Sequence, residues 1–478
     1  MVYNSSMKKM KTAPTHSSNT RQSIRAKHFF DTAFKTFSLA DNVRSIPAID
    51  GLKPSQRKAL YGTLDRGENA NFLQVERLAS LIAAVTDYHH GAGSMEKTIA
   101  GMGATKYPGS NNMNLFVPEG QFGSRLTKEP GAGRYIETML SPYFRQLFKK
   151  DDDAILEHNY LDKERLEPKL YLPILPLVLV NGASGTGTGH ACEIKSYHPT
   201  EIRDAVMNVL AGKKLKPGTL TPWFRGFHGT VKRNPETGQV IMTGKMQIVN
   251  TTKIIITELP VGVFLDDYKS HLHNLMEPRR NKDGEIIEPA LVKDYVDSST
   301  EDGFEFTITV PRTTTDLSEE ELYQKFKLIS RDTENFTIWN RDGVLQRFNS
   351  AEAIIEEFMT WRLGFFEVRR QKLISDTNEA IRFQSEVVRF IKFYLANVKV
   401  FRDTSKKALI DLMTVVNDFP DYDRLLSMAI WNLTKDKIAE LEKKLNDLKA
   451  YLATLEADSA GEMYKRELKA FKYEEELL

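Results

Sequence analysis

The stretch VERLASLIAAVTDYHHGAGSMEKTIAGMG, residues 75–103, decides the fold class of the first third of the chain. Residues 75–87 have the apolar spacing of an amphipathic helix, which YHHGAG ends. We expect Ser94 to be the N-cap of a second helix in MEKTIAGMG. Two helices around a short glycine turn fit a helix-turn-helix, whose second helix can enter a major groove, although most helix pairs bind no DNA.

The rest of residues 36–150 is also expected to be mostly helical, with short glycine-bearing turns. PSQRKALYGTL places Pro54 at a first helical position. EPGAGRYIETML, residues 129–140, is expected to pass from a loop with two glycines into a helix near Tyr135. The apolar residues after this tyrosine have the spacing of one helical face: Ile136, Met139 and Leu140. From these residues alone, the tyrosine is most simply a packing residue.

The composition is that of a globular protein of about two to four domains, since 478 residues are 41% hydrophobic and 27% charged. With 66 basic and 64 acidic residues, the formal net charge of +2 does not indicate a polyanionic partner. Residues 1–30 nevertheless contain no acid and several basic side chains: Lys8, Lys9, Lys11, Arg21, Arg25 and Lys27. We interpret residues 1–35 as a flexible basic arm, which fits a solvated tail and a nucleic-acid contact equally well.

Features that the sequence lacks bear on the cellular compartment. The longest apolar run, LPLVLV at 175–180, has the length of a strand, so no membrane span is expected. The N-terminal segment has no apolar signal-peptide core, and a single cysteine, Cys192, excludes an internal disulfide framework. We therefore expect an intracellular protein of the cytoplasm or nucleoid, or of the host cytoplasm if the source is viral.

Residues 151–345 are expected to form an α+β domain. Runs of β-branched residues bounded by glycine, proline and asparagine predict strands in KIIITEL, GQVIMTGKMQIV and GFEFTITVP. Helical pieces such as HPTEIRDAVMNVL and SEEELYQKFKLI lie between them.

Residues 346–478 are helical and contain the clearest periodicity of the chain. An a/d seam of nearly three heptads is formed by Ile438, Leu441, Leu445, Leu448, Leu452 and Leu455. Similar spacing in AIIEEFMTWRLGFFEV predicts a second long helix, and the two favour an antiparallel coiled-coil arm over a helical-bundle core. Between them lies a helical knob, about 400–433, whose apolar LLSMAIW (425–431) suggests an exposed dimerisation tip.

Several motifs point away from nucleotide and metal sites. LVLVNGASGTGTGH, residues 177–190, has neither the Gly-Lys-Ser/Thr of a phosphate loop nor a following helix, so we interpret it as an apolar strand and a tight turn that brings backbone close to a neighbour. One cysteine and no HExxH make a zinc site improbable, and Asp151–Asp153 fit a solvated helix end. No ATP or magnesium site is expected in this chain.

Five motifs stand in one order in the first 190 residues: GLKPSQRKALYG, YHHGAGS, GQFGSR, GRYIET and YLPILPLVLVNGASGTGTG. Together they strongly resemble the DNA breakage-reunion module of type IIA DNA topoisomerases, the family of the gyrase A chains and eukaryotic topoisomerase II. The resemblance covers about residues 36–478, and the layout is most like the medium subunit of T4-like phage topoisomerases. It implies a winged-helix cleavage domain (36–150), a tower domain (151–345) and a coiled-coil arm with a C-gate dimerisation domain (346–478).

In that family the tyrosine after an arginine is the nucleophile, which implies Tyr135 with Arg134 beside it. An aryl oxide can attack a phosphodiester, displace a sugar hydroxyl and store the bond as a reversible phosphotyrosine. The other active-site positions of the family map onto Arg57, for the phosphate and phenolate, and His90, for a hydrogen bond or proton relay.

The same motifs imply a set of DNA-binding residues: Lys53, Ser94, Lys97, Arg125, Lys128 and Thr186. The lysines and arginine are expected as backbone contacts without sequence preference. Thr186 stands where the family usually has an isoleucine that wedges between base pairs, which puts intercalation in doubt. At the positions where the gyrase chains carry a serine and an acid, this chain has Gly93 and Lys97, so gyrase-like quinolone sensitivity is not predicted.

The family's ATPase module and its acidic metal-binding TOPRIM module have no counterpart in the sequence. The resemblance therefore implies a breakage-reunion subunit of an ATP-dependent enzyme, with Mg²⁺ and ATP bound by partner chains. Its other partners would be double-stranded DNA and a second copy of itself, and relaxation and decatenation are the favoured activities. A protein that bends DNA without cutting it is the alternative; a dimerisation scaffold does not account for GRYIET.

Overall fold

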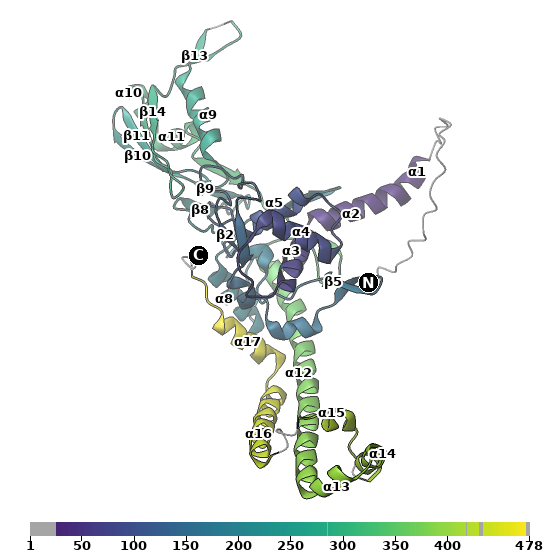
Figure 1. The fold of residues 1–478 in the computed structure, drawn as a ribbon. Coiled ribbons are helices and arrows are strands. Elements are labelled where there is room, and N and C mark those ends of the chain that lie inside the picture. The colour runs from purple at the N-terminus through teal and green to yellow at the C-terminus, as the bar shows by residue number, and fades with distance from the viewer. Residues whose placement is uncertain (1–24, 284, 417, 430–433, 475–478) are drawn as a thin grey trace. The chain divides into compact units, whose positions relative to one another are not determined.

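The computed structural model describes residues 25–283, 285–416, 418–429 and 434–474. Its described residues combine helices and sheets, as the sequence predicts. The chain divides into two compact units, Met1–Arg362 with Leu468–Leu478, and Leu363–Glu467 (Figure 1). Most of the predicted basic arm, residues 1–24, lies outside the described residues.

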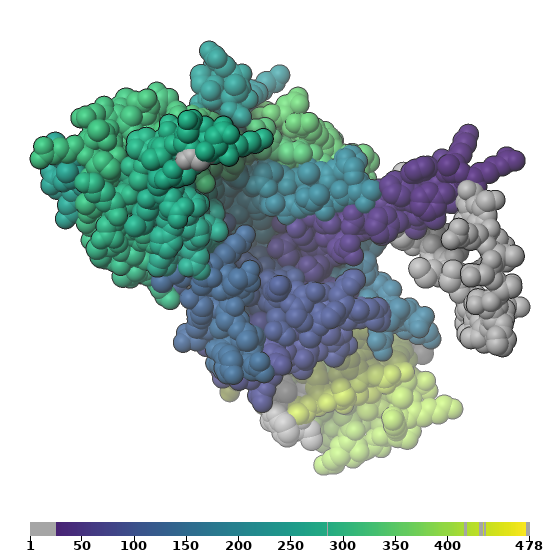
Figure 2. Space-filling model, turned by 90° about the horizontal axis from the view of Figure 1, so that it is seen from above, coloured from purple at the N-terminus to yellow at the C-terminus, as the bar shows by residue number. Residues whose placement is uncertain are grey.

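The first described element is a helical segment made of α1 (Ala26–Phe29), a π-helical turn η1 (Phe30–Phe34) and α2 (Lys35–Ser45). Within this segment only Asn42 is buried, where its Nδ2 donates to the Thr188 carbonyl at 3.0 Å and its own carbonyl accepts from Trp339 Nε1 at 3.2 Å. Figure 2 shows the purple residues of this segment extending beyond the blue residues that follow them. The segment is therefore anchored at its C-terminal end.

Three helices form the centre of the first unit: α3 (Pro54–Asp65), α4 (Val75–Thr86) and α5 (Ala92–Gly103). The predicted helix pair and the helical position of Pro54 are confirmed. The predicted cap is wrong, because α5 begins at Ala92 with Gly91 as its N-cap, and Ser94 lies in the first turn with its N–H donating to the Gly91 carbonyl at 2.9 Å. Glycine is an adequate N-cap, so the helix starts earlier than a search for hydroxyl caps indicates.

The predicted helix after Tyr135 is instead the central strand of a small antiparallel sheet. The sheet order is β1 (Leu73–Gln74), β3 (Glu137–Leu140) and β2 (Phe116–Glu119). Thr138 lies opposite both Leu73 and Pro118, and alternate residues Ile136, Thr138 and Leu140 are buried. Pairing with strands on both sides supplies backbone hydrogen bonds that the spacing of three apolar residues cannot reveal.

The apolar run at 175–180 is also not a strand. Leu177–Val180 is the short helix α7, buried all round, and the glycine-rich residues after it form a hairpin of β6 (Ala183–Gly187) and β7 (His190–Ile194). A short, fully buried apolar run has no period that separates strand from helix. Between β3 and α7 lie α6 (Tyr143–Leu147), η2 (Lys150–Ile155), β4 (His158–Leu161) and β5 (Glu164–Pro168).

The middle of the chain contains the strands that β-branched runs predict. A four-stranded antiparallel sheet has the order β10 (Lys245–Asn250), β11 (Lys253–Glu258), β15 (Phe306–Thr309) and β14 (Asp294–Asp297). Its buried face packs on α9 (Leu265–Met276) and α11 (Glu319–Lys325) through a core that includes Ile254, Phe306 and Leu272. A second sheet orders β16 (Ile329–Asp332), β9 (Val240–Thr243) and β8 (Thr230–Arg233).

Shorter elements complete this part of the chain. They are α8 (Pro199–Leu210), β12 (Arg279–Arg280), β13 (Ile286–Glu288), α10 (Arg312–Thr315), β17 (Phe336–Trp339) and β18 (Leu345–Phe348). The predicted helices in HPTEIRDAVMNVL and SEEELYQKFKLI are confirmed as α8 and α11.

Two long helices dominate the second unit, the part of α12 (Ala351–Ala396) beyond Arg362 and α16 (Lys435–Ala457), followed by α17 (Ala460–Ala470). They are antiparallel, because Arg370 Nη1 donates to the Leu455 carbonyl at 3.3 Å while Lys392 Nζ lies 2.7 Å from Glu442 Oε1. Leu441 and Leu455 of the predicted seam are buried. The other four seam positions are half-buried.

Between these helices lie α13 (Val398–Asp403), α14 (Lys406–Asp411), the π-helical η3 (Leu412–Val416) and α15 (Tyr422–Leu426). Leu425 is fully buried in a cluster with Phe390, Ile391 and Phe419, and Met428 packs against the same cluster. Of the other described residues of LLSMAIW, Leu426, Met428 and Ala429 are half-buried and Ser427 is exposed; residues 430 and 431 lie outside the described residues. None of the helices that the structure describes is long and apolar enough to cross a membrane.

Candidate active site

Tyr135 ends a tight turn and is the most exposed of the large hydrophobic side chains described, at 77%. Its backbone N–H donates to the Ala132 carbonyl at 2.8 Å, which closes the turn immediately before β3. The buried Ile136 beside it anchors the chain in the core, so the tyrosine is held at the surface by a fixed strand. A phenol presented in this way can reach a large substrate.

The turn is fastened to residues 74–76 at the start of α4. The N–H groups of Val75 and Glu76 donate to the carbonyls of Ile136 and Gly133 at 3.0 and 3.1 Å. First-turn N–H groups of a helix have no partner within the helix, so these bonds satisfy donors that would otherwise need water. The side-chain amide of Gln74 adds a third bond, to the Arg134 carbonyl at 3.2 Å.

Close packing explains the glycine at position 133. A Cβ atom there would lie 2.5 Å from Glu96 Oε2 and 3.1 Å from the Glu76 nitrogen. Gly133 is buried between the first turn of α4 and a side chain of α5. The loop that the sequence suggests to be flexible is therefore closely packed at this residue.

Arg134 lies beside the tyrosine, with its guanidinium 5.4 Å from the centre of the Tyr135 ring. Both side chains are exposed. A guanidinium over a phenol ring is attracted to the face of the ring, and its N–H groups are strong donors to a phosphate.

Arg57 occupies a different environment from the one implied by the resemblance. Its Nε donates to Asp50 Oδ2 at 2.7 Å, and its Nη2 donates to Asp50 Oδ1 and to the Leu52 carbonyl, both at 2.8 Å. Asp50 is fully buried and also accepts from the backbone N–H groups of Leu52 and Tyr171. This bidentate pair fixes the loop before α3, so the side chain of Arg57 is mainly engaged within the protein. Asp50 was not predicted, because nothing in the sequence shows that it is buried.

The exposed residues of α5 and the turn before it include three predicted site residues, His90, Ser94 and Lys97. The His90 ring contacts Tyr88 edge to face, with ring centres 5.3 Å apart. Within the described residues Lys97 makes no ion pair, so its ammonium group is available to an anion in solution. The turn before α5 therefore presents a histidine, and the helix itself presents a hydroxyl and a cation.

The glycine-rich hairpin lies against α2. Cβ atoms at Gly185 and Gly187 would overlap the Ser45 carbonyl oxygen and Asn42 Oδ1, which confirms the predicted close approach of backbone. Lys53 Nζ donates to the Ser184 carbonyl at 2.8 Å, and burial lowers the pKa of this lysine below its usual value. Thr186 is exposed beyond this contact.

Gly185→Ala is expected to destabilise the protein by about 2 kcal/mol, because the new methyl group must displace a backbone carbonyl rather than a flexible side chain. The urea midpoint of unfolding measures the effect. Gly303→Ala is the matched control, since a Cβ at Gly303 meets no atom within 4 Å. Equal midpoints for the two variants would show that the hairpin does not depend on this contact.

Arg125 is not available as a DNA clamp, which corrects the expectation from the sequence. Its side chain is 4% exposed, its Nη1 donates to Glu258 Oε1 at 2.7 Å, and its Nη2 donates to the Gly226 carbonyl. Glu258 also accepts from the N–H groups of His228 and Leu259. Both charges are buried and hydrogen-bonded, so this arginine ties its loop to the end of β11.

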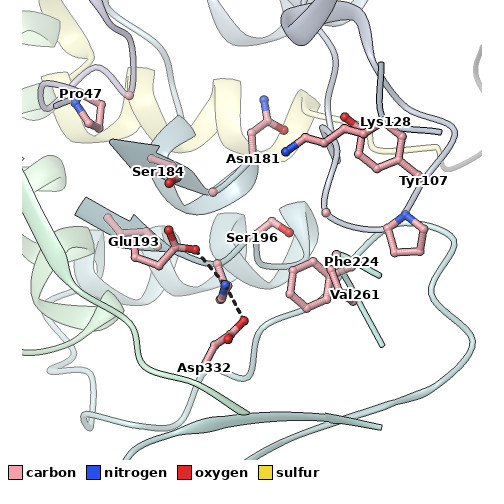
Figure 3. A pocket seen from close by; sticks show the side chains of 18 of the residues that line it. Pro47, Tyr107, Lys128, Asn181, Ser184, Glu193, Ser196, Phe224, Val261 and Asp332 are labelled. Atoms are coloured by element: carbon pink, nitrogen blue, oxygen red, sulfur yellow. Dashed lines mark hydrogen bonds and ion pairs between the residues drawn. The ribbon is translucent and has the colours of Figure 1, made fainter. Parts of the chain in front are cut away.

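A cavity of about 460 Å³ is lined by Lys53, Tyr107, Lys128 and the base of the hairpin. Figure 3 shows Lys128 extending across it toward Asn181. A third lysine, Lys195, is paired at 2.8 and 2.9 Å with Glu193 and Asp332, which the sequence did not indicate. Lys53 and Lys128 make no ion pair with any residue described, so neither charge is compensated by an acid in the described part of the cavity.

In the described ranges of the chain, no three His, Cys, Asp or Glu side chains gather in a group that could hold a metal ion.

The comparisons with known proteins give one family. The family model for the A chain of DNA gyrase and topoisomerase IV matches residues 44–469. DNA topoisomerase 2-beta and 2-alpha of Gallus gallus are 33% and 34% identical over 93% of this chain, which covers 29% and 30% of their lengths. The chain thus spans less than a third of these curated relatives.

Among solved structures, the Plasmodium falciparum topoisomerase II DNA-binding, cleavage and re-ligation domain superposes with a TM-score of 0.83 at 32% identity, over 92% of this chain and 63% of that one. The family match, the identities and this superposition agree with the five ordered motifs. The chain belongs to the family of the DNA gyrase and topoisomerase IV A chains and has the breakage-reunion core of type IIA topoisomerases.

Proposed function

We propose that this chain is the DNA-breakage and reunion subunit of an ATP-dependent type IIA DNA topoisomerase, and that Tyr135 is its nucleophile. The observation that carries the proposal is the 77% exposed phenol on a turn that three hydrogen bonds fasten to the start of α4. A nucleophile must be both accessible and fixed, because rate depends on the alignment of the reacting atoms.

In the proposed reaction, the Tyr135 oxygen attacks a backbone phosphorus atom, and the bond from phosphorus to the 3′ oxygen breaks. The phenol proton is released and the departing 3′ oxygen takes up a proton, so the strand ends are a 5′-phosphotyrosine and a 3′-hydroxyl. The reverse attack reseals the strand without an external energy source. A tyrosine of a second copy cuts the other strand, and another duplex passes through the break.

The exposed cations support the proposal because they can bind the DNA backbone by charge, without recognising the DNA sequence. Arg134, beside the Tyr135 ring, would stabilise the attacked phosphate, and Lys97, Lys128 and the remaining donors of Lys53 would bind DNA backbone. Arg57 would act indirectly. Its ion pair with Asp50 fixes the loop before α3, and Lys53 is the N-cap residue of that helix. His90, Ser94 and Thr186 are exposed and complete the proposed DNA surface.

The partners in the proposal are those that the family resemblance implies. ATP and Mg²⁺ would be bound by the ATPase and TOPRIM modules of one or more larger chains. The antiparallel helices α12 and α16, proposed as a coiled-coil arm, and the helices between them would provide a dimer contact with a second copy. The domain containing α3, α4 and α5 corresponds to a winged-helix domain, and the sheets after it correspond to the tower.

One experiment tests the proposal directly. The chain is mixed with a chain carrying the ATPase and TOPRIM modules, Mg²⁺ and supercoiled plasmid, and denatured with detergent. The DNA-linked peptide is then identified by mass spectrometry. We expect covalent adducts on the peptide that contains Tyr135. Adducts on another residue would refute Tyr135 as the nucleophile, and DNA binding without adducts would favour a protein that only bends DNA.

A further inference from the structure

Gln74 has an unusual position at the start of α4. It is the N-cap residue, with φ −54° and ψ 135°, yet its side chain makes no capping hydrogen bond. Serine, threonine, aspartate and asparagine are preferred at this position because their short side chains bond the first N–H groups of the helix. Here the N–H groups of Val75 and Glu76 are already used by the carbonyls of Ile136 and Gly133, so the loop itself caps the first two donors of the helix.

The Gln74 amide instead reaches across to the loop that carries Tyr135. Gln74 pairs with Glu137 in the register of β1 and β3, and its Nε2 donates to the Arg134 carbonyl at 3.2 Å. Three hydrogen bonds fasten the Tyr135 turn to the start of α4. A side chain makes this one, and the backbone N–H groups of Val75 and Glu76 make the other two. It is therefore the one that a substitution can remove.

The bonded carbonyl belongs to the peptide unit immediately before the nucleophile. The Arg134 carbonyl and the Tyr135 N–H are parts of the same planar group, so a bond to one orients the other. The N–H end is held by the Ala132 carbonyl at 2.8 Å, and the carbonyl end is held by Gln74. With both ends held, the Tyr135 Cα is fixed on one side, and the bond from the Val75 N–H to the Ile136 carbonyl holds the chain on the other side.

We propose that Gln74 is a positioning residue for Tyr135, which orients the phenol for attack and takes no part in the chemistry. This inference rests on the proposed function. It assigns to Gln74 a contribution to the cleavage rate that is separate from DNA affinity and from folding. The hydrogen bond of Gln74 lies at the surface, and two backbone hydrogen bonds also hold the same turn, so the fold does not depend on the side chain.

The test compares variants that keep or remove the donor. Gln74→Met has nearly the same length, carries no charge and cannot donate, whereas Gln74→Lys regains a donor on a flexible side chain. Gln247→Met, at an exposed strand position of β10, controls for loss of a surface amide. Each variant is assayed with the complete complex for single-turnover DNA cleavage at saturating protein, for DNA affinity and for its thermal midpoint.

We expect Gln74→Met to slow cleavage about tenfold with unchanged DNA affinity and thermal midpoint, since small misplacements of a nucleophile are costly in rate. Gln74→Lys should recover most of the lost rate, and Gln247→Met should match the wild type. Wild-type cleavage by Gln74→Met, a parallel loss of DNA affinity, or a Lys variant as slow as the Met variant would each overturn the inference. Tyr135→Phe is run beside them, because cleavage by that variant would refute the proposed function instead.

Discussion

Tyr135→Phe is expected to lower the rate of DNA cleavage at least about 10⁴-fold, since loss of the attacking oxygen leaves no group to form the covalent bond. The phenyl ring keeps the contact with Arg134, whose guanidinium lies 5.4 Å from the ring centre. DNA affinity and the thermal midpoint should therefore stay near wild-type values. Cleavage is measured as protein-linked DNA after detergent treatment, and affinity by anisotropy of a labelled duplex.

The matched control is Tyr160→Phe in β4, because Tyr160 is 64% exposed and lies in none of the five motifs. It should cleave at the wild-type rate. If Tyr135→Phe still forms adducts, another residue is the nucleophile. If wild type and variant both fail to form adducts while both bind DNA, the chain holds DNA without cutting it.

Arg125→Met is expected to destabilise the protein by about 3–5 kcal/mol, because Glu258 would be left buried with an uncompensated charge. The free energy of unfolding in urea measures the loss. Arg125→Met/Glu258→Gln should regain part of it, since an amide carries no charge and its oxygen can still accept a backbone N–H. DNA affinity per folded molecule should not change, because the Arg125 side chain is only 4% exposed.

Lys128→Met should lower DNA affinity and leave the stability of the protein nearly unchanged, the reverse of Arg125→Met. Its exposed ammonium contributes little to folding but is available to a phosphate, so DNA affinity should fall and the salt dependence of binding should drop by about one counterion. If Arg125→Met weakens DNA binding without loss of stability, the assignment of Arg125 as an internal tie is wrong.

The sequence predicts elements well where the signal is local. The helix pair of α4 and α5, the β-branched strands such as β11, and the heptad spacing of α16 all follow from patterns within one segment. The prediction errors occur where contacts with distant segments determine the secondary structure. β3 is a strand because β1 and β2 pair with it on both sides, and Leu177–Val180 is a helix inside a core that leaves no exposed face to give a period.

The residues of the candidate site also differ in whether the sequence around them is enough to identify them. GRYIET identifies Arg134 and Tyr135 because a resemblance in five ordered motifs singles them out, and both are exposed. Arg57 and Arg125 look like surface cations in the sequence, and only the folded structure shows them paired with buried acids, Asp50 and Glu258. Gln74 could not be found from sequence, because its role depends on a turn 60 residues later.

The pairing of Arg125 with Glu258 has a consequence for how this chain folds during its synthesis. The two residues are 133 positions apart, so the loop that carries Arg125 emerges from the ribosome well before its acid does. Until β11 is made, a guanidinium that ends up buried has no counter-charge, and burial at that stage is unfavourable. The loop that carries Arg125 therefore reaches its final packing only after β11 has been synthesised.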